Sequence, residues 1–447
     1  MTFRSILTLA AALGIAQATC AANMLDSIIV RNASGVVVAR SYFRYDSNDY
    51  QTQVAHYTWN KDKEVWVGTY KEDCQYDEAG HILQKTTAKW NFDTDNWISV
   101  MKNEMAYDAK GRETMHASYK MDPTTGKWIG QEKRATAFNA LGLPQSSDTE
   151  SWDNAKGVWK PDTRKLTTYN DHGKPTVIET QKYEAQRDAF VSSKRTTNQY
   201  DATGKTMTLT VNDNWNTEQN RWESESRYRY AFANGKMQTS VKDTWDRVAA
   251  DWKMFEKMSY EYDAQGNTAS VQRDEWNGTQ WLTTRKERIE SKYDEYFNKT
   301  YEERKRWNGG DTWTGISKKE LKFDEYGAVL NEIRYRWDAS GAEWVGISYH
   351  EYTYDPMGNI SSETIRKWDN AIKDWMPMSA MAFAYDEYYN KILETNSSWN
   401  PVSNQWVEFF KGKHEYSYDG EGNVLTNSEY HWEKGKWIKI SEITYHY

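Results

Sequence analysis

The chain has only two cysteines and seven prolines, and about half of its hydrophobic residues are aromatic, Met or Cys and not aliphatic. Two cysteines cannot form a disulfide framework, and so few prolines in a strongly patterned sequence argue against disorder. A mean hydropathy of −0.96 excludes a bundle of membrane helices. The 57 basic residues are outnumbered by 65 acidic ones, which leaves no basic field for a nucleic acid. What the chain does have is 23 Trp, 31 Tyr and 12 Phe, which predicts a core made mainly of aromatic side chains.

The first residues have the composition of a secretory signal peptide. Arg4 precedes an apolar run over residues 6–15 and a stretch of small residues, so we expect cleavage near Ala21 or Ala22 and a signal peptide over residues 1–22. Lipidation of Cys20 is the alternative that the sequence leaves open. We therefore expect an exported protein, located in the periplasm, at the cell surface or outside the cell.

From residue 45 to residue 447 the chain consists of thirteen repeats of about 31 residues. Each repeat opens with an aromatic residue, as at Tyr76 and Tyr354. A first Trp follows about fourteen positions later, and a second Trp comes five to seven positions after the first. These two columns hold all 23 Trp of the protein, including the pairs Trp90 and Trp97, Trp337 and Trp344, and Trp368 and Trp375. Met121, Tyr183 and Phe190 replace the three missing Trp.

Each repeat also carries two turn signals. The opening aromatic is followed by Asp-x-x-Gly, as in Asp77 to Gly80 and Asp355 to Gly358. Asp at the first position accepts hydrogen bonds from turn amides, and Gly at the fourth takes the left-handed conformation. Asp or Asn directly after the first Trp begins the second turn. Two turns in each repeat leave two segments of about ten residues, which predicts two β-strands.

The side-chain pattern predicts an all-β fold. The second Trp and the next opening aromatic are separated by an even number of residues, which predicts one aromatic face. Twenty-six strands in sequential hairpins predict an antiparallel meander that coils into a spiral or shell, with a β-propeller as the alternative. Residues 23–44 predict an aliphatic hairpin that caps the first repeat. Ser224, Ser226, Ser348 and His350 make the expected aromatic face too polar for lipid, so we expect a protein that does not span a membrane.

No catalytic, cofactor or metal site is predicted. The eight His occupy different repeat positions without metal spacing, and a turn needs only the one carboxylate that each repeat supplies. Cys74 lies at a position that holds Met105 and Thr136 in the next repeats, which is typical of a packing residue rather than a nucleophile.

The recurring motif YDxxG, seen as YDEAG, YDAKG, YDATG, YDAQG, YDPMG and YDGEG, resembles the YD repeat of RHS-type secreted bacterial proteins. This resemblance implies β-hairpins wound into a large shell. The family unit is shorter and lacks the Trp pair, and the chain shows no toxin or self-cleaving region. The aromatic hairpin is similar, more distantly, to choline- and glucan-binding repeats, which bind in aromatic cradles between hairpins.

Three functions remain open from the sequence. The first is a non-enzymatic repeat protein that presents a long β-surface to a protein or polysaccharide at the bacterial cell envelope or outside the cell. The second is a glycan-binding protein with exposed Trp and Tyr platforms, and the third is an enzyme with a site inside the shell. A specialised site is expected where a repeat departs from the pattern, at Met121, Tyr183, Phe190, Phe297 and Tyr389.

Overall fold

The computed structural model describes residues 24–447, and this part of the chain contains strands and turns without a helix. The expected signal peptide and Cys20 lie outside the described residues. The strands are β1 (Ser27–Asn32), β2 (Val37–Tyr45), β3 (Gln51–Asn60), β4 (Val65–Tyr76), β5 (Ile82–Asn91), β6 (Asn96–Tyr107), β7 (Glu113–Met121), β8 (Trp128–Phe138), β9 (Pro144–Asp153), β10 (Val158–Tyr169), β11 (Pro175–Glu184), β12 (Ala189–Tyr200), β13 (Met207–Asn216), β14 (Arg221–Ala233), β15 (Lys236–Asp246), β16 (Asp251–Tyr262), β17 (Thr268–Trp276), β18 (Trp281–Tyr293), β19 (Lys299–Gly309), β20 (Thr312–Phe323), β21 (Val329–Asp338), β22 (Glu343–Tyr354), β23 (Ile360–Asp369), β24 (Asp374–Tyr385), β25 (Lys391–Asn400), β26 (Gln405–Tyr418), β27 (Val424–Glu433) and β28 (Lys436–His446).

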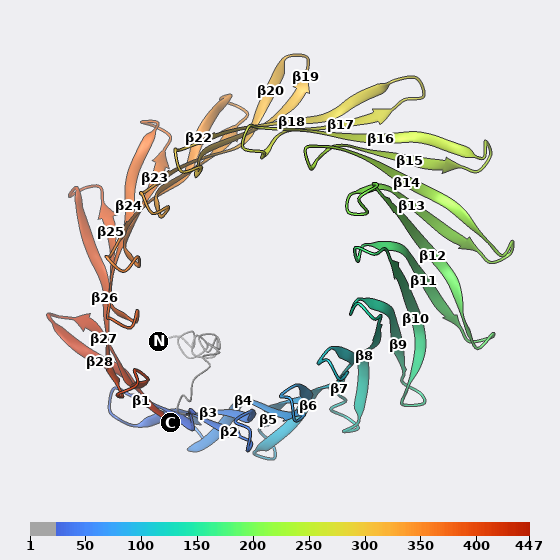
Figure 1. Cartoon of the computed structure of the whole chain (residues 1–447). Helices are drawn as coiled ribbons and strands as arrows, with labels where there is room; N and C mark the ends of the chain where they lie inside the picture. The colour runs from blue at the N-terminus through green and yellow to red at the C-terminus, as the bar shows by residue number, and fades with distance from the viewer. Residues whose placement is uncertain (1–23) are drawn as a thin grey trace.

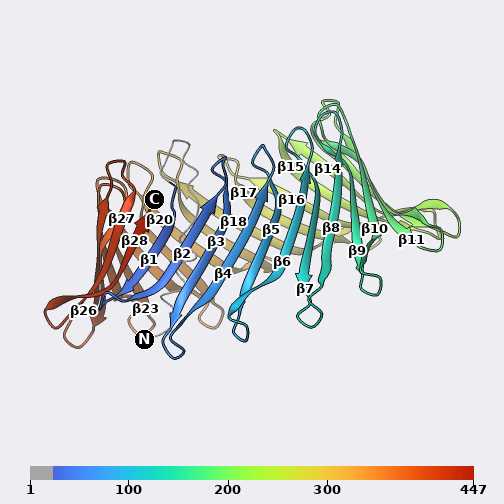
Figure 2. The same ribbon diagram turned by 90° about the horizontal axis from the view of Figure 1, so that it is seen from below.

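All 28 strands form one antiparallel sheet that closes on itself (Figures 1 and 2). Each strand pairs with the next in sequence, and β1 also pairs with β28, from Ser27 opposite His446 to Asn32 opposite Ser441. The predicted meander of repeated hairpins is confirmed. The predicted spiral and the propeller alternative are wrong, because the sheet is a closed barrel. The hairpin of β1 and β2 keeps the strand number even, so β28 meets β1 antiparallel and neither sheet edge stays unpaired.

A β-bulge follows the second Trp position in every repeat. In β3 and β4, Tyr57 pairs with Gly68 and the preceding His56 pairs with Tyr70, so that Thr69 is an extra residue. The same irregularity recurs in the other twelve hairpins that join the two Trp positions. An extra residue reverses the alternation of side chains between the two faces of the sheet.

The bulge places the two aromatic columns on opposite faces. Trp66 pairs with Trp59, and Lys71 pairs with Ala55. Trp59 and Ala55 are an even number of positions apart on β3 and share a face, so Trp66 and Lys71 also share a face although five positions separate them. The usual alternation then continues from Lys71, so Tyr76, ten positions after Trp66, lies on the other face. The single aromatic face expected from even spacing is wrong, because spacing arguments assume an unbroken strand. We name the two sides of the sheet the Trp face and the Tyr face.

Buried apolar side chains gather where the barrel closes. Ile28, Phe43, Val54 and Ile443, from β1, β2, β3 and β28, are buried and pack together. Elsewhere the sheet is a single layer in which the Trp rings are half-buried and two of them, Trp406 and Trp432, are 40% exposed. Stability therefore depends on contacts between neighbouring hairpins and not on one central aromatic core.

Candidate binding surface

The Asp-x-x-Gly turns are built as their residue types require. The Asp77 carboxylate accepts hydrogen bonds from the backbone amides of Ala79 and His81, both at 2.9 Å, and Gly80 has a φ of 87°. Asp355 accepts the corresponding bonds from Met357 and Asn359, both at 2.9 Å. Gly358, the matching Gly of that turn, has a φ of 86°. Asp at the first position thus fixes the backbone on which the following turn residues are displayed.

In several repeats the opening Tyr joins neighbouring hairpins. The hydroxyl of Tyr76 donates a hydrogen bond of 2.9 Å to the carbonyl of Gln51, and that of Tyr354 donates one of 2.8 Å to the carbonyl of Val329. The acceptor is in both cases the residue 25 positions earlier. The Tyr column is therefore a structural tie along the barrel.

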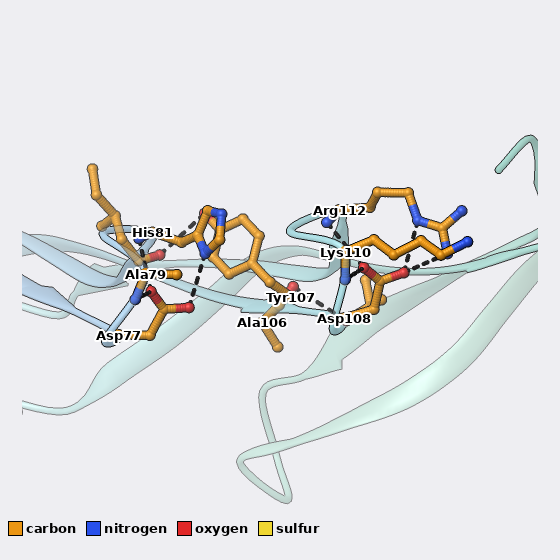
Figure 3. A network of polar contacts seen from close by, with 10 residues as sticks. Asp77, Ala79, His81, Ala106, Tyr107, Asp108, Lys110 and Arg112 are labelled. Carbon is orange, nitrogen blue, oxygen red and sulfur yellow. Dashed lines mark hydrogen bonds and ion pairs between the residues drawn. The ribbon is translucent and has the colours of Figure 1, made fainter.

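In two N-terminal turns, an aromatic or cationic side chain covers the next opening aromatic, and Figure 3 shows the first of these, His81 beside Tyr107. The His81 ring stacks on Tyr107 at 4.7 Å between centroids and also contacts the Asp77 carboxylate at 2.9 Å. Arg112 lies over Phe138 at 4.4 Å. Hydrogen bonds from the side chain and the backbone amide of Arg112 lower the pKa of Asp108 to about 2.

The Trp residues form cross-strand pairs on the Trp face. Three pairs illustrate the geometry: Trp90 with Trp97 at 5.3 Å between ring centroids, Trp337 with Trp344 at 5.2 Å, and Trp368 with Trp375 at 5.3 Å, all edge-to-face. Edge-to-face packing is a favourable arrangement of aromatic rings. The replacement residues keep the pattern, because Tyr183 packs on Phe190 at 5.5 Å and Met121 is paired with Trp128.

Neighbouring hairpins interlock through these pairs. A Cβ on Gly346 would lie 2.5 Å from the Trp375 ring of the next repeat, so the close approach requires glycine. Cations contribute as well: Arg227 lies over Trp252 at 4.8 Å and contacts the buried Asp243 carboxylate at 2.6 Å. The Asp243 carboxylate also forms an ion pair with Arg229 at 2.9 Å, so its buried charge is paired. We assign this cluster a structural role.

The extra residue of the bulge changes character along the chain. In the last five hairpins it is always a large apolar residue, and we name this row the bulge stripe: Ile316, Ile347, Met378, Phe409 and Ile440. Its last four members are 38–67% exposed. In the first six hairpins the same position is polar, except for one Val: Thr69, Val100, Gln131, Asp162, Ser193 and Glu225.

A second group of exposed apolar side chains lies on four consecutive Asp-x-x-Gly-type turns at one end of the barrel, between β18 and β25. We name it the aromatic rim: Tyr296, Phe297, Tyr326, Met357, Tyr388 and Tyr389. Its members are 43–87% exposed. At the third position of the turn, the other repeats with this four-residue turn carry Asn48, Ala79, Lys110, Leu141, His172, Thr203, Gln265 or Glu421. Only Leu141 among those is large and apolar.

Two rim residues occupy positions that favour glycine. Phe297 has a φ of 64° and Tyr389 a φ of 65°, in the left-handed region. The corresponding position in most other turns is glycine, as at Gly80 and Gly358. A side chain with a Cβ in this conformation costs about 1–2 kcal/mol. Two exposed aromatic rings are thus present where they weaken the fold.

The rim was only partly predictable. Phe297 and Tyr389 were expected as departures from the repeat, whereas Tyr296, Tyr326, Met357 and Tyr388 were missed. The signal for three of them is the dipeptide Glu-Tyr after the turn Asp, which occurs in the turns that start at residues 294, 324 and 386. The bulge stripe has no comparable signal, because only strand register reveals which residue is extra.

Other candidate chemistry has ordinary surroundings. Burial raises the pKa of the Cys74 thiol, and the nearby Glu72 carboxylate raises it further, which disfavours the reactive thiolate. Over residues 24–447, no group of three or more His, Cys, Asp or Glu is placed to hold a metal ion. Within the same residues there is no helix long and apolar enough to cross a membrane.

No family model and no curated protein sequence matches the chain. Solved structures to which it is similar include a protein of unknown function from Bacteroides fragilis, with 16% identity over 29% of this chain and 91% of that one and a TM-score of 0.25. A DUF3836 family protein from Bacteroides vulgatus has 20% identity over 21% of this chain and 90% of that one, with a TM-score of 0.19. The Tc holotoxin pore of Photorhabdus luminescens has 12% identity over 91% of this chain and 26% of that one, with a TM-score of 0.24.

Proposed function

We propose that this is an exported, non-enzymatic protein that binds a macromolecule through the aromatic rim. The observation that carries the proposal is the run of four consecutive turns that expose large apolar side chains, two of them at left-handed positions. The turn itself does not require these rings, because it forms elsewhere with Ala79 and Gly80. Of the rim rings, Tyr388 also packs on Tyr418 of the next repeat, at 4.3 Å between ring centroids. Exposed aromatic clusters are typical of binding sites, where aromatic residues supply much of the affinity.

The turn geometry favours binding by a preorganised surface. The backbone amides of Tyr296, Tyr326 and Tyr388 each donate a hydrogen bond of 2.9–3.0 Å to their turn Asp. The backbone beneath the rings is therefore fixed before a partner arrives, which lowers the entropy lost on binding. The repeated architecture supports a non-enzymatic role, because a row of similar turns offers several similar contacts and not one unique constellation.

The charge of the rim favours a partner that is not a polyanion. Glu295, Glu325 and Glu387 are exposed beside the rim Tyr residues, and the whole chain carries a net charge of −8. Nucleic acids and other polyanions would be repelled by this surface. The partner is accordingly a protein or a polysaccharide without strong negative charge.

Binding to envelope material of the native host tests the proposal. The rim variant combines Tyr296→Ser, Phe297→Gly, Tyr326→Ser, Tyr388→Ser and Tyr389→Gly. The matched control is Leu141→Ser, which removes an exposed apolar side chain from the same turn position in an N-terminal hairpin. We expect the rim variant to lose sedimentation with the envelope fraction while the control keeps it. Equal sedimentation of the wild-type protein and the rim variant would contradict the proposal.

Export is tested separately. N-terminal sequencing of the protein purified from its native host is expected to give a mature chain that begins near Ala22. A chain that still begins with Met1 would contradict export, and this result does not depend on the binding experiment.

A further inference from the structure

The ligand class follows from the chemistry of the aromatic rim. Five of its six side chains are aromatic rings, and no Leu, Ile or Val stands at the second to fourth positions of these four turns. Flat rings pack against the C–H faces of sugar rings with little loss of conformational freedom, because a Tyr or Phe side chain has only two rotatable angles.

Carboxylates accompany the rings. Glu295, Glu325 and Glu387 each precede a rim Tyr, are exposed and form no ion pair within the described residues. An ionised carboxylate only accepts hydrogen bonds, and sugar hydroxyls are donors that it can bind. The rim positions contain no Lys or Arg, so a sugar polymer that carries phosphate, sulfate or carboxylate groups would find no cation there.

The spacing of the turns restricts the ligand further. Successive rim turns are separated by two strands, which is about 10 Å along the sheet. This distance is close to the length of one disaccharide in an extended β-linked polysaccharide. Every second sugar of such a chain would therefore meet a rim turn, in the same orientation each time, and three of the four turns present a ring there. A helical α-linked chain does not keep this repeat.

We propose that the aromatic rim binds a neutral, extended β-linked polysaccharide across the turns that start at Asp294, Asp324, Asp355 and Asp386. This inference rests on the proposed function and adds the ligand class. Rings at Tyr296 and Tyr326 carry sugars two positions apart, and Tyr388 carries a sugar four positions further along because Met357 occupies the turn between them. The neighbouring Glu carboxylates accept hydrogen bonds from sugar hydroxyls. Binding strengthens with chain length, because each further turn engages without a new loss of translational freedom.

Isothermal titration calorimetry of the mature protein with cellohexaose, chitohexaose and maltohexaose tests the inference. We expect one or both β-linked hexaoses to bind, the corresponding disaccharides to bind at least tenfold more weakly, and the α-linked maltohexaose to give no heat. Tyr326→Ala, which removes the most exposed rim ring, is expected to weaken binding about tenfold, whereas Leu141→Ser leaves it unchanged. Glu325→Gln keeps the shape of the side chain and is expected to weaken binding by a smaller factor.

The outcomes separate the inference from the proposed function. If the rim variant loses envelope binding but neither β-linked hexaose binds the wild-type protein, the proposed function stands and the polysaccharide inference is wrong. Binding of a basic peptide such as oligolysine without sugar binding would assign the rim to a cationic protein segment and also overturns the inference. Sugar binding that survives Tyr326→Ala and the rim variant would place the sugar site elsewhere and overturns it as well.

Discussion

The N-terminal hairpins, from β3 to β14, and the last five hairpins, from β19 to β28, share one backbone and differ in what they expose. Both regions keep the turn Asp, the Tyr tie and the cross-strand aromatic pairs. At the bulge the first region has mostly polar residues such as Thr69 and Gln131, whereas the second has the bulge stripe. Residues that recur in every repeat maintain the fold, and the proposed binding surface rests on residues that change together over neighbouring repeats.

The turns differ in the same direction. In the N-terminal region His81 and Arg112 cover the aromatic ring of the next repeat. In the C-terminal region the same position is often Asn, as at Asn298 and Asn359, whose amides donate hydrogen bonds of 3.0 Å to their own turn Asp. These Asn side chains thus bond back to their own turn. The exposure of the rim follows from the large apolar residues added at the third and fourth turn positions.

Acid is expected to have the largest effect on the whole barrel, because the turn carboxylates are used in both regions. Hydrogen bonds from Arg112 lower the pKa of Asp108 to about 2, and hydrogen bonds involving His81 and Asn359 lower the pKa of Asp77 and Asp355. A carboxyl group with a lowered pKa in the folded state stabilises the fold above its unfolded pKa of 3.8. That stabilisation is lost as the pH falls from there towards about 2. Far-UV circular dichroism against pH checks this, and an unchanged spectrum at pH about 2 would contradict it.

Removing one ring of a Trp pair is expected to be the most damaging single substitution. Trp337→Ala should destabilise the local hairpins by about 2–4 kcal/mol, somewhat less than a fully buried Trp, because the ring is half-buried. Trp432→Ala removes a more exposed ring and should cost about half as much. Hydrogen exchange is the suitable measurement, since neighbouring hairpins should lose protection before distant ones. Uniform loss of protection around the barrel would contradict a stability that depends on local contacts.

The repeated part of this architecture was predictable, because it rests on residue types with local consequences. Asp77 and Gly80 specify a turn wherever they occur, and the regular Trp spacing predicts the hairpin. Closure was not predictable in this way, since the pairing of Ser27 with His446 joins the two ends of the chain and has no local signal. The two-faced arrangement was missed because the extra residue of the bulge carries no fixed amino-acid type.

Restoring glycine at the rim is expected to stabilise the protein slightly. Phe297→Gly and Tyr389→Gly remove a Cβ from the left-handed conformation, and each should raise the free energy of unfolding by about 1 kcal/mol. The N-terminal control is Asp49→Gly, whose φ is 66°, and the gain there should be smaller because Asp tolerates this conformation. Chemical denaturation measures all three. A loss of stability in the rim variants would show that the rings pack against the fold and would remove the main support for the rim as a binding surface.

The smallest effect on stability is expected at the bulge stripe, where the two regions can be made alike. Met378→Thr and Phe409→Thr give the C-terminal bulges the chemistry of Thr69, and both side chains are about half to two-thirds exposed, so the free energy of unfolding should change by less than about 0.5 kcal/mol. The matched change in the other direction is Thr69→Phe. Exposed apolar rows promote association, so the double variant should remain monomeric to higher concentration than the wild-type protein, and Thr69→Phe should not. Analytical ultracentrifugation checks both. If Met378→Thr and Phe409→Thr instead unfold the last hairpins, the stripe is part of the packing that holds β24 and β26 in the barrel, and only the aromatic rim distinguishes the C-terminal region as an interaction surface.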